Sequence, residues 1–164
     1  MASWREFESA EPEMAAVGRA LLDRIPIMYL ATVLRDGAPR IHPVCPIFAE
    51  GRMFVAVAPT SPKRWDLRRD GRYALHGLPG KRDDEFYLTG RARLIDDPAL
   101  RQAVADGAGH TVRPDDWVFE LDVEQAMTAY WEHMGQPNTY PVRRWWPPLP
   151  KDLPRHRNDP AAAG

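Results

Sequence analysis

The stretch 53–71, MFVAVAPTSPKRWDLRRDG, joins an apolar run to a short basic segment. Residues 53–57 are aromatic, β-branched or small and apolar, which is typical of a buried strand. Ser61 suits a helix N-cap, and Pro62 suits the first helical position, where a missing N–H group costs nothing. The basic helix then runs as far as Gly71, a residue type that favours helix ends. We therefore predict a strand, a turn and a short helix, and we arrange the rest of the chain around this unit.

The turn before this helix carries both hydroxyl groups and positive charges. Thr60 and Ser61 supply the hydroxyls, and Lys63 and Arg64 supply the charges. Free N–H groups at a helix N-terminus add to the attraction for a negatively charged group. Taken alone, such a segment is more often an ordinary capped helix start. Its position after a buried strand favours an anion-binding loop instead.

The length and charge of the chain limit the kinds of protein it can be. Its 164 residues suit one domain with a core of its own. We assign residues 1–146 to this domain, while the proline-rich residues 147–164 form a tail that cannot build a core. The formal net charge of −1 gives no general attraction to nucleic acid or to an anionic membrane, so we expect neither as a partner.

Cysteine and histidine usage argues against a metal centre. The single cysteine, Cys45, excludes an internal disulfide and a cysteine-based metal cluster. The 5 histidines show no spacing typical of metal ligands, so we expect no metal site. Residues 1–6 lack the basic start and apolar run of a signal peptide, and no apolar stretch is long enough to span a membrane. These features predict a cytoplasmic protein.

The remaining sequence alternates apolar runs with short turns. We predict a helix over residues 8–25 with Ser9 as its N-cap, and a short helix from Asp97 to Ala105. Pro43 and Pro46 cannot donate to a ladder, so the strand that contains them is expected at an edge or broken. The predicted strands cover residues 27–34, 40–48, 53–57, 73–78, 86–95, 117–123 with a continuation at 127–131 after a bulge, and 140–146. About seven strands and three helices favour a mainly β fold, an antiparallel β-barrel with α-helices attached.

Five short motifs occur in an order that resembles a known family. They are YLATV at 29–33, DGAPRIHPV at 36–44, SPK at 61–63, DLRRDGR at 66–72 and GRA at 90–92. Their order and spacing, over residues 24–122, resemble the pyridoxamine 5′-phosphate oxidase-like family of flavin- and deazaflavin-binding proteins. The resemblance implies a split β-barrel of the FMN-binding type. It also implies a homodimer that binds FMN, or alternatively the deazaflavin F420, in a groove between its two subunits.

The resemblance further assigns candidate cofactor-binding residues. Those expected along the cofactor are Arg40, His42 and Val44, and those expected to hold its phosphate are Thr60, Ser61 and Lys63. His76 and Gly77 are expected near the ring or ribityl chain of the cofactor. Trp131 and Arg144 are expected to extend across the dimer interface toward the cofactor of the other subunit. In this family the flavin carries the hydride chemistry, so we name no catalytic side chain. The implied function is an FMN-dependent oxidoreductase that transfers hydride to or from an unidentified small molecule.

The C-terminal part of the domain supplies large aromatic side chains that suit a subunit interface. They are Trp131, Tyr140, Trp145 and Trp146. Aromatic and Arg-rich surface is typical of interface cores, which supports the homodimer implied by the resemblance.

The sequence departs from the family in one respect, and other function classes stay open. The basic residues that hold substrate phosphate in true pyridoxamine phosphate oxidases have only a loose match in residues 143–146, so pyridoxal phosphate synthesis is not expected. One alternative is a carrier that binds flavin or haem without catalysis. Another is a barrel that binds single-stranded nucleic acid through residues 143–146 and the basic helix. Acidic residues among the basic ones, such as Asp66 and Asp70, argue against this last class.

Overall fold

An eight-stranded antiparallel sheet and four helices make up residues 1–149, the part of the chain described by this computed structural model. The helices are α1 (Trp4–Ala10), α2 (Pro12–Arg24), α3 (Lys63–Arg69) and α4 (Pro98–Gly107). The strands are β1 (Met28–Val33), β2 (Pro39–Val44), β3 (Ile47–Ala49), β4 (Arg52–Val57), β5 (Arg72–Gly77), β6 (Glu85–Leu94), β7 (Trp117–Glu132) and β8 (Tyr140–Trp146). The predicted mainly β fold is confirmed, whereas most of the proposed tail, residues 150–164, lies outside the described residues.

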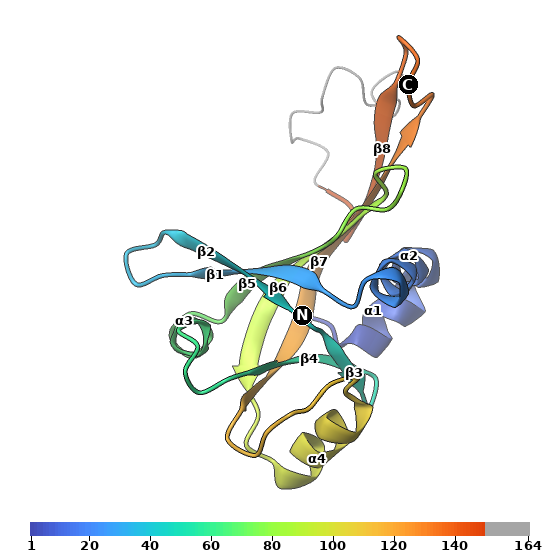
Figure 1. Cartoon of the computed structure of the whole chain (residues 1–164). Coiled ribbons are helices and arrows are strands. Elements are labelled where there is room, and N and C mark those ends of the chain that lie inside the picture. The colour runs from blue at the N-terminus through green and yellow to red at the C-terminus, as the bar shows by residue number, and fades with distance from the viewer. Residues whose placement is uncertain (150–164) are drawn as a thin grey trace.

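The strands follow the order β2-β1-β5-β6-β7-β4-β3, and β8 pairs with the outer half of β7 (Figure 1). The helices lie against different parts of this curved sheet, with α1 and α2 on one side of its centre and α4 beside β3. None of the helices within residues 1–149 is both long enough and apolar enough to cross a membrane.

The N-terminal region forms two helices, so the prediction of one helix over 8–25 with Ser9 as its N-cap is wrong. Ser3 accepts a hydrogen bond from the Glu6 N–H, and the Glu6 carboxylate accepts one from the Ser3 N–H. This reciprocal capping box starts α1 upstream of the predicted start. Pro12 then disfavours helical geometry at the preceding residue, so the chain turns at Glu11 before α2 begins.

The predicted strand over 40–48 is two strands in the structure. β2 and β3 are separated at Cys45 and Pro46, and they lie at opposite ends of the strand order. Pro39 and Pro43 both lie in β2. Within the described residues this strand pairs with β1 on one side and with no strand on the other, so it is an edge strand. The expectation that this strand is broken or lies at an edge is therefore confirmed.

β6 and β7 form the longest pairing in the sheet, and a bulge divides it. Thr89 pairs with Gln125 while Gly90 pairs with Val123, so Glu124 is the extra residue on β7. The bulge expected between residues 123 and 127 is confirmed. Beyond it, the residues of β7 from 126 onward pair with β8 in a hairpin that projects from the body of the molecule (Figure 1). We call residues 126–146 the hairpin arm.

Two apolar clusters hold these elements together. In the first, Trp4 and Phe7 of α1 pack with their rings against Phe86 of β6. In the second, Val104 of α4 covers Val118 of β7 on the other side of the sheet. Because all five of these side chains are at most 1% exposed, β7 is buried on both faces where α4 covers it.

Candidate functional site

The loop between β4 and α3 has the strand–turn–helix form that the sequence predicts. α3 begins at Lys63, and Pro62 is the N-cap, with backbone angles that are already helical. The prediction that Ser61 caps the helix is therefore wrong, because no side chain caps α3. Within residues 1–149, neither the Thr60 nor the Ser61 hydroxyl takes part in a hydrogen bond. Both groups are thus free to donate to a ligand.

Alternation along β2 directs one set of side chains toward α3. Arg40, His42 and Val44 pair in register with Thr32, Leu30 and Met28 of β1, which are all at most 2% exposed. Paired residues of antiparallel strands share a face of the sheet. The intervening Ile41 is 63% exposed, so it lies on the opposite, outer face. The predicted alternation of this strand is confirmed.

Asp66 of α3 lies at the centre of the contacts between α3 and these strands. Its carboxylate accepts a hydrogen bond of 3.1 Å from the Thr32 hydroxyl of β1. It also lies 3.2 Å from Arg40 Nη1 of β2 and 3.5 Å from Arg69 Nη1 in its own helix. Asp66 is 4% exposed, so these contacts compensate a buried charge and orient the Arg40 guanidinium. Sequence reasoning missed this role, for which an acidic residue inside a basic helix was the available signal.

Replacing Asp66 with alanine is expected to lower the free energy of unfolding by about 2 kcal/mol, because Arg40 and Thr32 lose a buried partner. Urea denaturation followed by tryptophan fluorescence measures the change. Asp36→Ala is the control, since Asp36 is an exposed loop residue whose carboxylate accepts one hydrogen bond within residues 1–149, from the nearby Ala38 N–H. Equal effects of the two substitutions would show that Asp66 does not tie α3 to the sheet.

The groups around Arg40 and His42 are positively charged and incompletely paired. Arg40 Nη1 and His42 Nε2 are buried and have no hydrogen-bond partner in the described part of the chain, and the Arg40–Asp66 ion pair lacks hydrogen-bond geometry. Burial lowers the pKa of Lys63. Burial also lowers the pKa of His42, and the neighbouring charges of Lys63 and Arg40 lower it further while Asp66 opposes them. We call Arg40, His42, Thr60, Ser61 and Lys63 the anion cluster. A bound anion would accept hydrogen bonds from the unpartnered donors and would stabilise the charged forms of Lys63 and His42.

We expect His42 to titrate below its ordinary pKa of 6.5. The unfolded chain then binds this proton at a higher pH than the folded protein does. The free energy of unfolding is therefore not reduced by this group above pH 6.5. It decreases as the pH falls from 6.5 toward the folded-state pKa of His42. Inorganic phosphate should raise the pKa, since a negative charge favours the imidazolium form.

An NMR titration of the imidazole resonances measures this pKa, and His42→Gln identifies the resonance. The prediction fails if the pKa in phosphate-free buffer is 6.5 or higher, or if phosphate leaves it unchanged.

Two other predicted residues of the site lie elsewhere. His76 pairs in register with Tyr29 and Tyr87, which places it on the outer face with Ile41. Its Nδ1 lies 2.6 Å from the carbonyl oxygen of Gly77. Gly77 itself points into the core, where an added Cβ would contact Leu21. Within one subunit, neither residue therefore joins the anion cluster. The predicted cation Arg64 also points away, since its guanidinium lies over the rings of Trp65 and Trp117.

The predicted residues of the hairpin arm have partners within the subunit. The Trp131 indole N–H donates to Asp83 at 2.9 Å. Arg144 forms ion pairs with Glu11 and, at 2.8 Å, with Glu13. Neither side chain approaches α3, and the paired Arg144 weakens the case for a nucleic-acid-binding surface on residues 143–146.

Comparison with known proteins decides the family. Residues 14–130 match the family described as Pyridoxamine 5'-phosphate oxidase. The chain belongs to this family. The resemblance seen in the five motifs is thereby confirmed. No curated protein matches the sequence.

Solved structures share the fold of this chain. A heme binding protein from Mycobacterium smegmatis matches with a TM-score of 0.60 and 19% identity over 80% of this chain, which spans 58% of that protein's length. A NimC/NimA family protein from Clostridium acetobutylicum matches with a TM-score of 0.56 and 18% identity, covering 79% of this chain and 94% of that one. A protein of the pyridoxinephosphate oxidase family from the same organism, related to general stress protein 26, matches with a TM-score of 0.58 and 13% identity over 80% and 94% of the two chains. The fold is therefore the split β-barrel predicted from the sequence.

Proposed function

We propose that this protein is an oxidoreductase that binds FMN, with the cofactor phosphate held by the anion cluster. The observation that carries the proposal is the pair of buried nitrogens without hydrogen-bond partners, Arg40 Nη1 and His42 Nε2, beside Lys63. A phosphate monoester carries a strong negative charge and several acceptor oxygens, which matches this set of donors. Membership of the pyridoxamine 5′-phosphate oxidase family makes a flavin the appropriate carrier of that phosphate.

In this proposal each group of the anion cluster has a distinct part. Arg40 and Lys63 neutralise the phosphate charge, and the Thr60 and Ser61 hydroxyls donate hydrogen bonds to its oxygens. His42 and Val44 border the path of the cofactor along β2. Bound flavin supplies hydride transfer to or from a small molecule, and the protein supplies binding, orientation and a positive local field.

We further propose that the functional unit is a homodimer formed through the outer face of the sheet. Tyr29 is 46% exposed and Ile41 is 63% exposed, and His76 and Tyr87 lie on the same face. A second copy over this face would bury them and bring His76 of each subunit toward the partner. Trp131 can contribute to a cofactor groove only in such an assembly, whereas Arg144 lies on the α2 side of the sheet and Gly77 points into the core, so neither of these two faces the proposed interface.

Sedimentation at micromolar concentration tests the dimer. The wild type should sediment as a dimer. A stable interface of this kind buries more than about 1,000 Å² in total. Ile41→Glu should sediment as a folded monomer, because it places a charge within the proposed interface while Ile41 is exposed in one subunit. A wild-type monomer that still binds flavin would remove the dimer and leave the cofactor proposal standing.

The deazaflavin F420 is the close alternative to FMN, since it also presents a phosphate to the anion cluster. A carrier of flavin or haem without catalysis is a second candidate function, favoured by the similarity to the heme binding protein. Titration of the apoprotein with FMN, F420 and haemin, followed by absorption, separates the ligands. Turnover with a reductant then separates an enzyme from a carrier. Failure of FMN to bind well above micromolar concentration would overturn the central proposal.

A further inference from the structure

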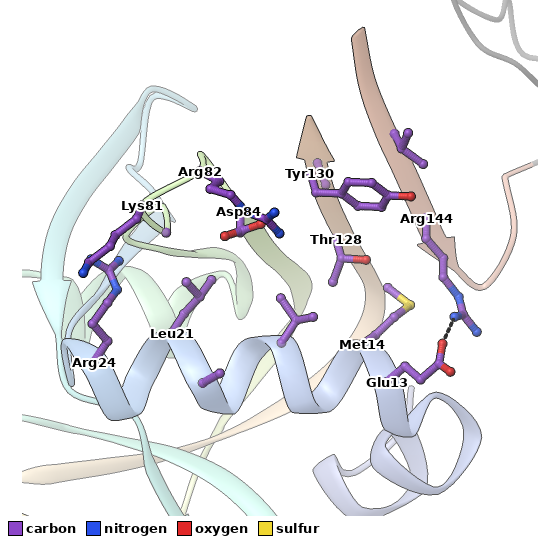
Figure 2. A pocket seen from close by; sticks show the side chains of 15 residues that line it. Glu13, Met14, Leu21, Arg24, Lys81, Arg82, Asp84, Thr128, Tyr130 and Arg144 are labelled. Atoms are coloured by element: carbon purple, nitrogen blue, oxygen red, sulfur yellow. Dashed lines mark hydrogen bonds and ion pairs between the residues drawn. The ribbon is translucent and has the colours of Figure 1, made fainter. Parts of the chain in front are cut away.

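A cavity lies on the side of the molecule away from α3 (Figure 1). It is bounded by α2, by the loop 78–84 between β5 and β6, and by the hairpin arm (Figure 2). Its volume is about 600 Å³, within the range of small-molecule binding sites. We call it the α2 cleft. It contains none of the residues of the anion cluster, so it is a separate site.

The floor and inner wall of the α2 cleft are apolar. α2 contributes Met14, Val17 and Leu21, and the hairpin arm contributes Ala129 and Val142. Met14 is 1% exposed and Leu21 is 7% exposed, so both belong to the core and form a fixed surface. Such walls favour the apolar body of a ligand, whose burial removes hydrocarbon from water.

The two ends of the cleft differ in charge. At one end, Arg144 is neutralised by Glu11 and Glu13, and the Arg144–Glu13 pair is drawn in Figure 2. At the other end, Arg24 and Lys81 lie close together, with Arg82 and Asp84 above them (Figure 2).

Within residues 1–149, the cations at this second end form no ion pair with a carboxylate. The Arg24 guanidinium donates to the carbonyl oxygens of Leu78 and Pro79, which fixes the loop against α2 but leaves the charge uncompensated. Among residues 1–149, no carboxylate lies within ion-pair distance of Lys81 or Arg82. Of the two carboxylates that line the cleft, only that of Asp84 lies at this end, together with three cations, and Asp83 of the same loop accepts from Trp131 outside the lining. The local field at this end favours an anion.

We propose that the α2 cleft binds an amphipathic anion, a small molecule with one acidic head group on an apolar body. The head group lies among Arg24, Lys81 and Arg82, and the body extends along α2 toward Met14. The cationic end favours a charged head group over a neutral lipid, and the apolar floor favours an apolar body over a polar metabolite. The site is independent of FMN, so its test does not depend on the cofactor proposal.

Calorimetric titration of the full-length protein with octanoate tests the site. 1-Octanol has the same apolar body without the charge, and octyl phosphate exchanges the carboxylate for a phosphate. We expect octanoate to bind and 1-octanol to bind at least about tenfold more weakly, since charge-assisted contacts to the head group are lost. The ratio of octanoate to octyl phosphate affinity identifies which acidic head group the site prefers.

Three variants locate the binding. Lys81→Ala combined with Arg82→Ala removes two exposed cations and should weaken octanoate about tenfold or more while leaving 1-octanol unchanged. Ala20→Trp fills the cleft from an exposed position on α2, so it should abolish binding of both molecules without disturbing the core. Lys63→Ala is the control for unspecific attraction to the anion cluster and should leave octanoate affinity unchanged. The proposal is overturned if octanoate does not bind, if 1-octanol binds equally well, or if Ala20→Trp binds octanoate like the wild type.

Discussion

Replacing Lys63 with alanine is expected to weaken FMN binding about ten- to a hundredfold. A hydrogen bond to a charged group contributes about 1.5–3 kcal/mol, and each 1.4 kcal/mol changes affinity about tenfold. The substitution removes one of the two cations that face the proposed phosphate, and the burial that lowers the Lys63 pKa shows that this ammonium is not fully solvated. Fluorescence quenching of free FMN by the apoprotein measures the dissociation constant.

Riboflavin is the matched ligand control, because it has the same ring and ribityl chain without the phosphate. Lys63→Ala should leave riboflavin binding unchanged if this residue holds the phosphate. Lys81→Ala is the matched residue control, since it removes a lysine that lines the α2 cleft instead. If Lys63→Ala weakens riboflavin and FMN alike, Lys63 contacts another part of the cofactor and the phosphate assignment is wrong.

Replacing Gly90 with alanine is expected to lower the free energy of unfolding by about 3 kcal/mol. Gly90 lies at the bulge, where the backbones of β6 and β7 approach closely. An added Cβ would overlap the carbonyl oxygen of Asp122 and would lie 2.9 Å from its carbonyl carbon and 3.2 Å from the Glu124 nitrogen. These are backbone atoms held by the ladder on both sides of the bulge, so the added carbon can be accommodated only by moving the central pairing of the sheet. Urea denaturation gives the change.

Gly109→Ala is the matched control for Gly90→Ala. An added Cβ at Gly109 meets no atom within 4 Å, so the change in stability there should be within about 0.5 kcal/mol. A similar small effect at Gly90 would mean that the bulge relaxes freely. Such a result would also mean that the glycine in the Gly90-Arg91-Ala92 motif has no steric role in the fold.

Strands were predicted well because their signal is local. Alternation places the strand at 86–95 within one residue of β6, and the turn signal at Pro137 and Asn138 places the return strand 140–146 at the bounds of β8. The start of the first helix was predicted poorly because two signals compete there. Ser9 is a reasonable cap in isolation, but the reciprocal Ser3–Glu6 bonds begin a helix earlier and Pro12 interrupts it.

The candidate site was predicted only in part, because the sequence does not reveal the register in which distant strands pair. Residues within one segment, such as Arg40 and His42 on β2, could be assigned to a common face from alternation alone. Whether His76 shares that face depends on how β5 pairs with β1, a contact between segments more than 40 residues apart. The role of Asp66 depends in the same way on the packing of α3 against β1 and β2, which no periodicity in the sequence reveals.

The prolines of β2 have a consequence for how molecules of this protein behave at high concentration. Residues 39 and 43 direct their nitrogens to the same side of the strand, and a proline in a sheet is tolerated where its nitrogen meets the unpaired side. The free side of β2 therefore lacks N–H donors at both positions, and β3 at the far end of the strand order is only 3 residues long. Exposed strand edges are where proteins recruit one another into aggregates. With both ends blunted in this way, the sheet resists growth by strand addition, and association through its faces is favoured instead.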